Sequence, residues 1–195
     1  VVNGKEAGAY ILVTLDGNDE DEIFQRAETL AEIGDELGAY DTLMLRDAAD
    51  KAAVWAARSA FLTVIEAETD LLDEMDVVVP VDRIAEFLSF VHDVGVKNDV
   101  RIRSFGHAGD GNLHIYCCGN DIEQEEFLVK SRMVMKEAYA KCAELGGQVS
   151  GEHGIGHAKK HYLRASVGDT AHNMMTGIKQ VFDPNFILNP GKVCS

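Results

Sequence analysis

The chain has 195 residues, of which 46% are hydrophobic and 26% charged, a composition typical of a globular protein with enough residues for one good core. Lysine and arginine number 18 against 33 aspartate and glutamate residues, so the formal net charge is −15 and no basic block could hold a phosphate backbone. We therefore expect one domain that does not bind nucleic acid.

The chain also lacks the features of membrane and secreted proteins. No apolar run approaches the roughly 18 to 20 residues of a membrane span, and the first residues show neither Met nor the pattern of a secretory leader. The four cysteines have no C-x-x-C spacing, so neither a disulfide framework nor a thiolate zinc site is indicated. We expect a soluble, cytoplasmic chain that begins within a longer protein.

The first third of the chain predicts strands and helices in alternation. Residues 9–17 and 42–45 are short β-prone runs and predict two strands. Residues 19–39 repeat apolar positions at helical spacing up to Gly38, and residues 47–69 predict one long, Ala-rich helix.

The remaining two thirds predict a similar mixture of elements. Strands are expected at 76–80, 100–105 and 112–117. Helices are expected at 83–95, 121–145, 157–164 and 169–182. A strand running into a glycine-rich loop is expected at 146–156, and an irregular tail at 183–193. These elements predict an α+β sandwich, with helices covering one face of a mostly antiparallel sheet.

Two histidines flank a glycine-rich turn in "SFGHAGDGNLHIY", residues 104–116. On one helix, His107 and His114 would stand about 10 Å apart along the axis, too far to share one ion. Asp110-Gly111 is a strong turn dipeptide that lets the chain reverse. In the returning strand, the period of two places His114 on the polar face, toward His107. We therefore expect a hairpin that brings the two imidazoles together.

A third metal ligand is offered by "SGEHGIG", where Glu152 and His153 stand between glycines at a strand end. Two histidines and one carboxylate make a three-ligand site with open positions, which is typical of catalytic metal sites. The sequence thus predicts a metal site at His107, His114 and Glu152. The other four histidines lie in helical stretches without such a context, and we expect them to be structural or solvated.

Three motifs, "GHAGDGNLH", "SGEHGIG" and "VFDPNFILNPGKV", occur in this order and carry a resemblance to a known family. The chain resembles the C-terminal substrate domain of FAD-linked oxidases of the vanillyl-alcohol-oxidase type, such as D-lactate dehydrogenase, the glycolate oxidase D-subunit and D-2-hydroxyglutarate dehydrogenase. The resemblance implies a ferredoxin-like α+β domain over residues 1–195, without the FAD-binding domain. It also implies oxidation of a D-2-hydroxy acid to the 2-oxo acid with hydride transfer to FAD, and a chain that is inactive alone.

The resemblance also implies roles for the residues of the first two motifs. His107, His114 and Glu152 would hold a divalent metal, namely zinc, iron or manganese. His153 would be the catalytic histidine beside the substrate hydroxyl and would also bind the substrate.

Residues outside these two clusters are implied to bind substrate and flavin. Arg58 in "WAAR" matches the arginine that holds the substrate carboxylate, and it shares a helix face with Trp55. A guanidinium pairs with a carboxylate through two parallel hydrogen bonds. Asn189 and Asn112 match positions against the flavin. Glu74 stands where some members have a lysine for a second carboxylate, so a monocarboxylate such as lactate or glycolate is favoured.

The expected partners are the small 2-hydroxy acid, the FAD domain of the same full-length protein and an electron-acceptor protein. Two other functions are compatible with the residues. Two histidines and one glutamate also suit a zinc-dependent hydrolase, although H-E-x-x-H is absent. The same domain could also be a non-catalytic metal-binding module, because a fold alone proves no activity.

Overall fold

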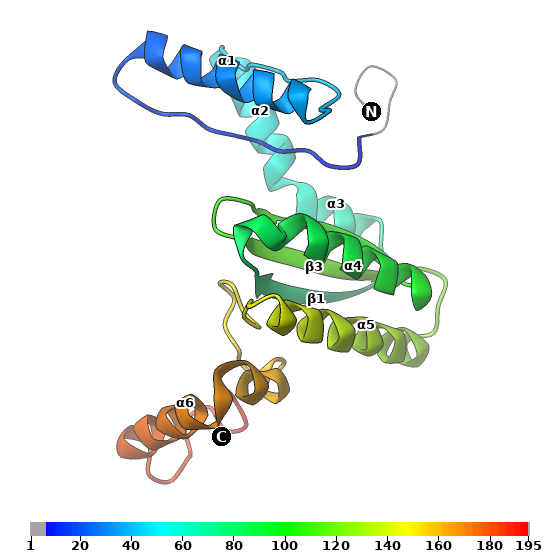
Figure 1. Ribbon diagram of the computed structural model, residues 1–195. Coiled ribbons are helices and arrows are strands. Elements are labelled where there is room, and N and C mark those ends of the chain that lie inside the picture. Colours follow the sequence, from blue (N-terminus) through cyan, green and yellow to red (C-terminus); the bar gives the residue numbers. More distant parts are fainter. Residues whose placement is uncertain (1–6, 195) are drawn as a thin grey trace. The chain divides into compact units, whose positions relative to one another are not determined.

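A computed structural model of the chain describes residues 7–194 (Figure 1). The chain divides between Ser59 and Ala60 into two compact units. Helices and a small antiparallel sheet make it an α+β protein, as the sequence predicts. None of the described helices is long and apolar enough to cross a membrane.

The first unit contains two helices, α1 (Glu20–Glu36) and α2 (Ala48–Ser59). Asp19 caps α1, because its carboxylate accepts hydrogen bonds from the N–H groups of Asp21 and Glu22 at 2.9 and 3.2 Å. The acidic first turn also suits the positive end of the helix dipole. The predicted helix at 19–39 is therefore confirmed, with its start fixed by a capping side chain.

The strands predicted at 9–17 and 42–45 are wrong. Both runs are irregular, and neither is a strand of the described sheet. Their apolar side chains are largely solvent-exposed, with Ile11 at 78% and Leu43 at 71%. A β-prone run becomes a strand only when a neighbour supplies ladder hydrogen bonds. The strand prediction at these positions rested on local β propensity alone, which does not show whether a pairing partner exists.

The second unit contains four further helices, namely α3 (Phe61–Ala67), α4 (Ile84–Lys97), α5 (Gln124–Glu144) and α6 (Lys160–Phe182), and the 3-10 turn η1 (Val81–Arg83). The helix predicted at 47–69 forms as two helices, with a break at Ala60 that no side chain explains. The two helices predicted after residue 157 form one element, α6, which Gly168 interrupts with a φ of 79°.

The sheet has three strands, β1 (Leu71–Val78), β2 (Arg101–His107) and β3 (Asn112–Gly119). They pair in the order β1-β3-β2 and are all antiparallel. The strand predicted near residue 148 is reduced to one antiparallel bridge between Val78 and Gln148, on the free edge of β1. With that bridge as a fourth position, the order and the two helical crossovers match the expected ferredoxin-like arrangement.

The two faces of the sheet differ in chemistry. One face belongs to the main core under α4 and α5 (Figure 1), and it carries Met75, Val77, Leu113, Ile115 and Cys117. The alternate residues of β3, among them His114 and Tyr116, point to the opposite face, as the period of two predicts. There Tyr116 packs with Ile65 of α3. The polar side chains of β3 thus stand on the face away from α4 and α5.

The hairpin between β2 and β3 depends on Gly111. Its φ of 80° lies in the left-handed region, and its carbonyl accepts a hydrogen bond from Val79 N–H at 3.0 Å. A Cβ atom at this position would overlap the carbonyl oxygen of Val79. The predicted reversal at Asp110-Gly111 is therefore confirmed, and it requires glycine at the second position.

We expect Gly111→Ala to lower the free energy of unfolding by more than about 2 kcal/mol, because the left-handed backbone alone costs a Cβ-bearing residue about 1–2 kcal/mol and the overlap adds to it. Gly109→Ala, in the same turn with open space around the Cβ position, is the control and should change stability little. Urea unfolding followed by circular dichroism checks this. Equal midpoints for the two variants would contradict the account of the hairpin.

Candidate functional site

The hairpin brings two imidazoles to the sheet face opposite α4 and α5. His114 lies in the middle of β3, across from Phe105 on β2 and Asp76 on β1, and only 6% of its side chain is exposed. His107 ends β2, where it faces Asn112. The two imidazole rings lie 5.9 Å apart, edge to face. The structure therefore brings together the two histidines whose spacing predicts a shared ion.

Glu152 joins this cluster from the loop between α5 and α6. Its Oε1 atom lies 3.0 Å from His114 Nε2 and 3.8 Å from His107 Nε2. The three potential ligand atoms all lie within 4.8 Å of one another. Two imidazoles and one carboxylate suit zinc, iron or manganese and leave coordination positions open. The residues present thus fit a divalent metal.

A second group of side chains adjoins the first and shares His114. Glu74 Oε1 accepts a hydrogen bond from the Tyr116 hydroxyl at 3.2 Å, and it lies 3.3 Å from His153 Nδ1 and 3.7 Å from His114 Nδ1. The His153 ring stacks on the His114 ring at a centroid distance of 4.9 Å. Burial and the nearby Glu74 carboxylate raise the pKa of Tyr116, so its hydroxyl remains a donor. His153, half-exposed, stands beside the three candidate ligands.

The carboxylate of Asp76 fixes the loop that carries Glu152 and His153. Asp76 is 1% exposed and accepts hydrogen bonds from three successive backbone N–H groups, those of Gly151, Glu152 and His153. The Ser150 hydroxyl donates to the same carboxylate at 2.9 Å. Successive N–H groups directed at one anion form a backbone nest. One side chain of β1 thus holds the whole loop against the sheet.

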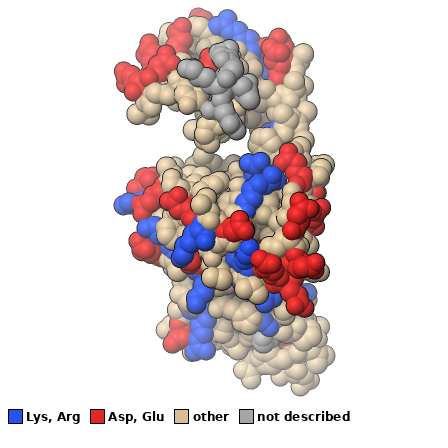
Figure 2. Space-filling model, turned by 90° about the vertical axis from the view of Figure 1, so that its right-hand side faces the viewer, with Lys and Arg blue, Asp and Glu red and all other residues tan. Residues whose placement is uncertain are grey.

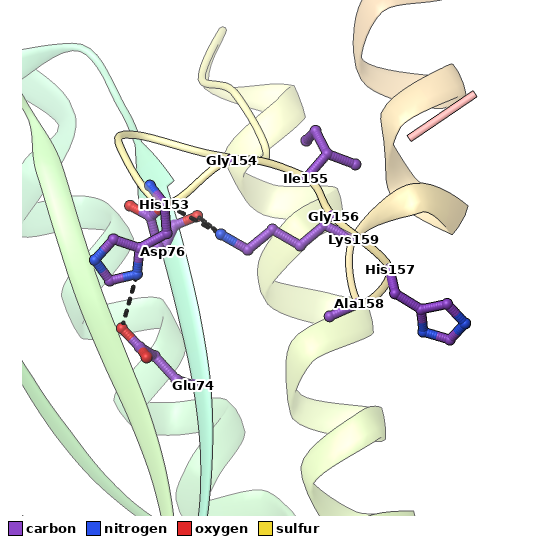
Figure 3. Close-up of a pocket in the computed structure, with 9 residues that line it drawn as sticks. All are labelled: Glu74, Asp76, His153, Gly154, Ile155, Gly156, His157, Ala158 and Lys159. Carbon is purple, nitrogen blue, oxygen red and sulfur yellow. Dashed lines mark hydrogen bonds and ion pairs between the residues drawn. The ribbon is translucent and has the colours of Figure 1, made fainter. Parts of the chain in front are cut away.

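Lys159 supplies the positive charge for this buried carboxylate. Its Nζ donates to Asp76 Oδ2 at 3.0 Å and to the Asp76 carbonyl at 3.1 Å (Figure 3). Burial alone would raise the pKa of Asp76, but the hydrogen bonds from His153, Lys159 and Ser150 outweigh it and lower that pKa from 3.8 to about 2. Asp76 is therefore ionised at neutral pH.

Asn112, a predicted flavin-contacting residue, lies against this loop. Its side-chain Oδ1 is buried and has no hydrogen-bond partner among residues 7–194. A Cβ atom at Gly151 would overlap that amide, so a larger residue there would force the side chain of Asn112 or Asp76 to shift. A pocket of about 270 Å³ lies along the same loop, lined by Glu74, Asp76 and residues 153–159 (Figure 3).

The C-terminal tail returns to the glycine-rich loop. Val193 N–H donates to the Gly156 carbonyl at 2.8 Å, and Lys160 Nζ donates to the Gly191 carbonyl at 3.0 Å. Asn189 lies in this tail with a φ of 46°. Two motifs that are far apart in the sequence therefore meet, and the predicted flavin contact of Asn189 stays a prediction.

One predicted site residue and two unpredicted ones need separate mention. Arg58 lies in α2 of the first unit, where it is partly buried, and its role as carboxylate anchor stays a prediction. Asp76 and Lys159 were not singled out by sequence reasoning. The signal available for Asp76 was an acidic residue at the start of the apolar run "DVVVP"; Lys159 in "HAKK" resembles any surface lysine.

The chain carries a formal net charge of −15. On the face shown in Figure 2, acidic and basic side chains are mixed, and the acidic ones do not gather in a single cluster. The charges that matter at the site are therefore local, and Glu74, Asp76, Glu152 and Lys159 supply them.

Comparisons with known proteins match almost the whole chain. The family described as "FAD linked oxidases, C-terminal domain" matches residues 2–193. The chain is 51% identical to "D-lactate dehydrogenase" of Anaerostipes hadrus over 99% of its own length and 41% of that protein. It is 33% identical to "Glycolate oxidase subunit GlcD" of Bacillus subtilis (strain 168) over 96% of this chain and 39% of that protein.

A third relative, "D-2-hydroxyglutarate dehydrogenase" of Stutzerimonas stutzeri (strain A1501), is 29% identical over 94% of this chain and 40% of that protein. The chain thus spans about two fifths of the length of these curated relatives, namely 41%, 39% and 40%.

We expect Asp76→Asn to lower the free energy of unfolding by about 3–5 kcal/mol, because it leaves the Lys159 ammonium buried without its partner. The double variant Asp76→Asn/Lys159→Met removes both charges and should recover part of the loss. Urea unfolding at neutral pH measures both variants. A single variant as stable as wild type would contradict the anchoring role of Asp76.

The same carboxylate predicts the pH dependence of this difference. Its pKa is lower in the folded protein than the ordinary 3.8, so its stabilisation is fully present above that value and is lost as the pH falls toward about 2. The stability gap between wild type and Asp76→Asn should therefore narrow below about pH 4. A gap that stays constant down to about pH 2.5 would contradict this.

Proposed function

The chain belongs to the family of FAD-linked oxidase C-terminal domains, and from this premise we propose that residues 1–195 form the substrate domain of a flavin-dependent dehydrogenase that oxidises a D-2-hydroxy acid. The observation that carries the proposal is the convergence of His107, His114 and Glu152 on one point beside His153. The relatives named D-lactate dehydrogenase and glycolate oxidase subunit support the substrate class.

The proposed reaction needs a divalent metal and FAD, and residues of this chain would hold the one and contact the other. His107, His114 and Glu152 would hold a divalent metal, whose positive charge, when bound, eases loss of the hydroxyl proton. FAD, held mainly by a separate domain and approached by Asn112 and Asn189, would accept the two electrons when bound. An electron-acceptor protein would be a further partner of the full-length enzyme.

The chain's own residues would position the substrate and take up its proton. Oxidation would break the O–H bond and the C2–H bond and form the carbonyl of the 2-oxo acid; FAD, when bound, would supply the acceptor for the C2 hydrogen and its electron pair. His153 is half-exposed, and its Nε2 lies 3.8 Å from Glu152 Oε1, on the side of the candidate ligands. We assign the hydroxyl proton to His153 Nε2, as expected of a general base within reach of its substrate.

The charges near His153 favour a small monocarboxylate. The Glu74 carboxylate, 3.3 Å from the His153 ring, would repel a second carboxylate on the substrate. Arg58 would anchor the single carboxylate through two parallel hydrogen bonds. We therefore favour lactate or glycolate over 2-hydroxyglutarate as substrate.

The four cysteines are free thiols, which supports a reducing compartment such as the cytoplasm.

In the full-length protein that joins this chain to a FAD-binding domain, D-lactate or glycolate should bleach the flavin absorbance and reduce an artificial dye, whereas D-2-hydroxyglutarate should act at least about tenfold more slowly, since repulsion of about 1.4 kcal/mol suffices for that ratio. The 195-residue chain alone should be colourless and inactive. Turnover by the chain alone, or a preference for the dicarboxylate, would contradict the proposal.

Glu152→Gln should weaken metal binding by more than about 100-fold, since loss of a ligand should exceed the 10–100-fold cost of losing an outer partner. Turnover should fall with the metal while the fold is retained. Metal analysis and a dye-reduction assay check both effects. Glu28→Gln on the exposed α1 removes the same charge and serves as the control. Unchanged metal affinity in Glu152→Gln would show that the site lies elsewhere.

A further inference from the structure

We propose that Glu74 is a positioning residue whose carboxylate holds the Nδ1 atoms of both His114 and His153, so that the Nε2 atoms of the two rings are presented to metal and substrate. The proposal rests on the function proposed above, because it takes His114 as a metal ligand and His153 as the proton acceptor. It adds a carboxylate that contacts neither metal nor substrate and acts through the two imidazoles.

One oxygen atom of Glu74 lies near a tyrosine hydroxyl and two imidazole nitrogens. Its Oε1 lies 3.2 Å from the Tyr116 hydroxyl, 3.3 Å from His153 Nδ1 and 3.7 Å from His114 Nδ1. Tyr116 is 2% exposed and stands directly opposite Glu74 in the register of β1 and β3. The Tyr116 hydrogen bond and the strand register thus place the carboxylate beside the Nδ1 atoms of both rings.

His114 needs an acceptor at Nδ1. A neutral imidazole that gives its Nε2 lone pair to a metal carries its hydrogen on Nδ1, and metal-bound histidines almost always donate that hydrogen to an oxygen. His114 Nδ1 is buried without a hydrogen-bond partner among the described residues. Glu74 Oε1 lies about half an ångström beyond normal hydrogen-bond length. The Glu74 side chain is partly exposed, so it has room to rotate toward that nitrogen when His114 binds a metal.

Glu74 also orients the His153 ring, with Nδ1 toward its own carboxylate. Its Nδ1 faces Glu74 Oε1 at 3.3 Å, while its Nε2 faces Glu152 Oε1 at 3.8 Å. A hydrogen on Nδ1, shared with Glu74, leaves the Nε2 lone pair free to accept the hydroxyl proton. The stacking of the His153 ring on His114 keeps both Nδ1 atoms on the Glu74 side. One carboxylate therefore selects the useful tautomer of two rings.

The same distances also admit Glu74 as a direct ligand, because Glu74, His114 and His153 form a second set of donor atoms within 4.8 Å. The chemistry of the proposed reaction argues against that alternative. A metal on His114 Nδ1 and His153 Nδ1 would leave Glu152 and His107 without a role, and it would occupy the atoms that must hold the tautomers. We therefore place the metal on the Nε2 side of His114.

The experiment compares Glu74→Leu with Glu74→Gln in the full-length flavoprotein. Glu66→Gln is the control, because the Glu66 carboxylate is near enough to raise the pKa of Tyr116 through its charge but is not among the ion-pair partners of His114 or His153. Zn²⁺ affinity is measured by competition with a chelator. The rate of D-lactate oxidation is then measured with the metal site saturated. These two readouts separate the effect on His114 from the effect on His153.

Glu74→Leu should weaken Zn²⁺ binding by about 10–100-fold, the usual cost of losing the partner of a metal-bound histidine, yet still bind the metal at saturation. With metal bound, its kcat should fall by at least about 10²-fold, the lower range for general-base catalysis, while KM changes little. Glu74→Gln keeps an oxygen acceptor and should recover part of both losses. Glu66→Gln should behave as wild type.

Unchanged Zn²⁺ affinity and kcat in Glu74→Leu would overturn the proposal, and so would complete loss of the metal at saturating Zn²⁺, which would make Glu74 a ligand. A wild-type protein that binds Zn²⁺ and flavin but oxidises no 2-hydroxy acid would overturn the proposed function and the role at His153. In that case the Zn²⁺ affinities would still decide whether Glu74 positions His114.

Discussion

The buried Asp76 carboxylate is the interaction on which the rest of the site depends. Glu152 and His153 come from a glycine-rich loop that has no regular secondary structure to place it, and Asp76 fixes it through three backbone N–H groups, a serine hydroxyl and a lysine. Moving an unpaired carboxylate from water into the protein interior would cost about several kcal/mol of free energy. Here the number of donors offsets that cost. The loop is thus tied to the strand that carries Asp76.

Side chains alternate along β1 and β3, so one face of the sheet packs in the core and the other carries the candidate site. On β1, Met75 and Val77 enter the core while Glu74 and Asp76 face the site. On β3, His114 alternates with core residues in the same way. A slip of one residue would send charged groups into the core and apolar ones into the site, so burial of the core also fixes the register of the side chains at the candidate site.

Sequence reasoning succeeded where the signal was local. The hairpin, its turn at Gly111 and the face of His114 follow from the turn dipeptide and the period of two. The strands predicted at 9–17 and 42–45 failed because pairing is a property of two segments, and the composition of one run says nothing about its partner. Asp76 escaped notice for the same reason, because its donors lie on a loop that follows two helices and two strands. Side-chain type and spacing predicted the candidate ligands, but not the residues that hold them.

The order of the candidate ligands along the chain has a consequence for assembly. His107 and His114 belong to one short hairpin, whose closure loses little chain entropy, whereas Glu152 arrives only after the whole of α5. A cation bound by all three would act as a cross-link between a local element and a distant loop, and it would favour the folded chain over the unfolded one by mass action. The hairpin would bring the two histidines together first, and the loop that carries Glu152 would complete the cross-link last.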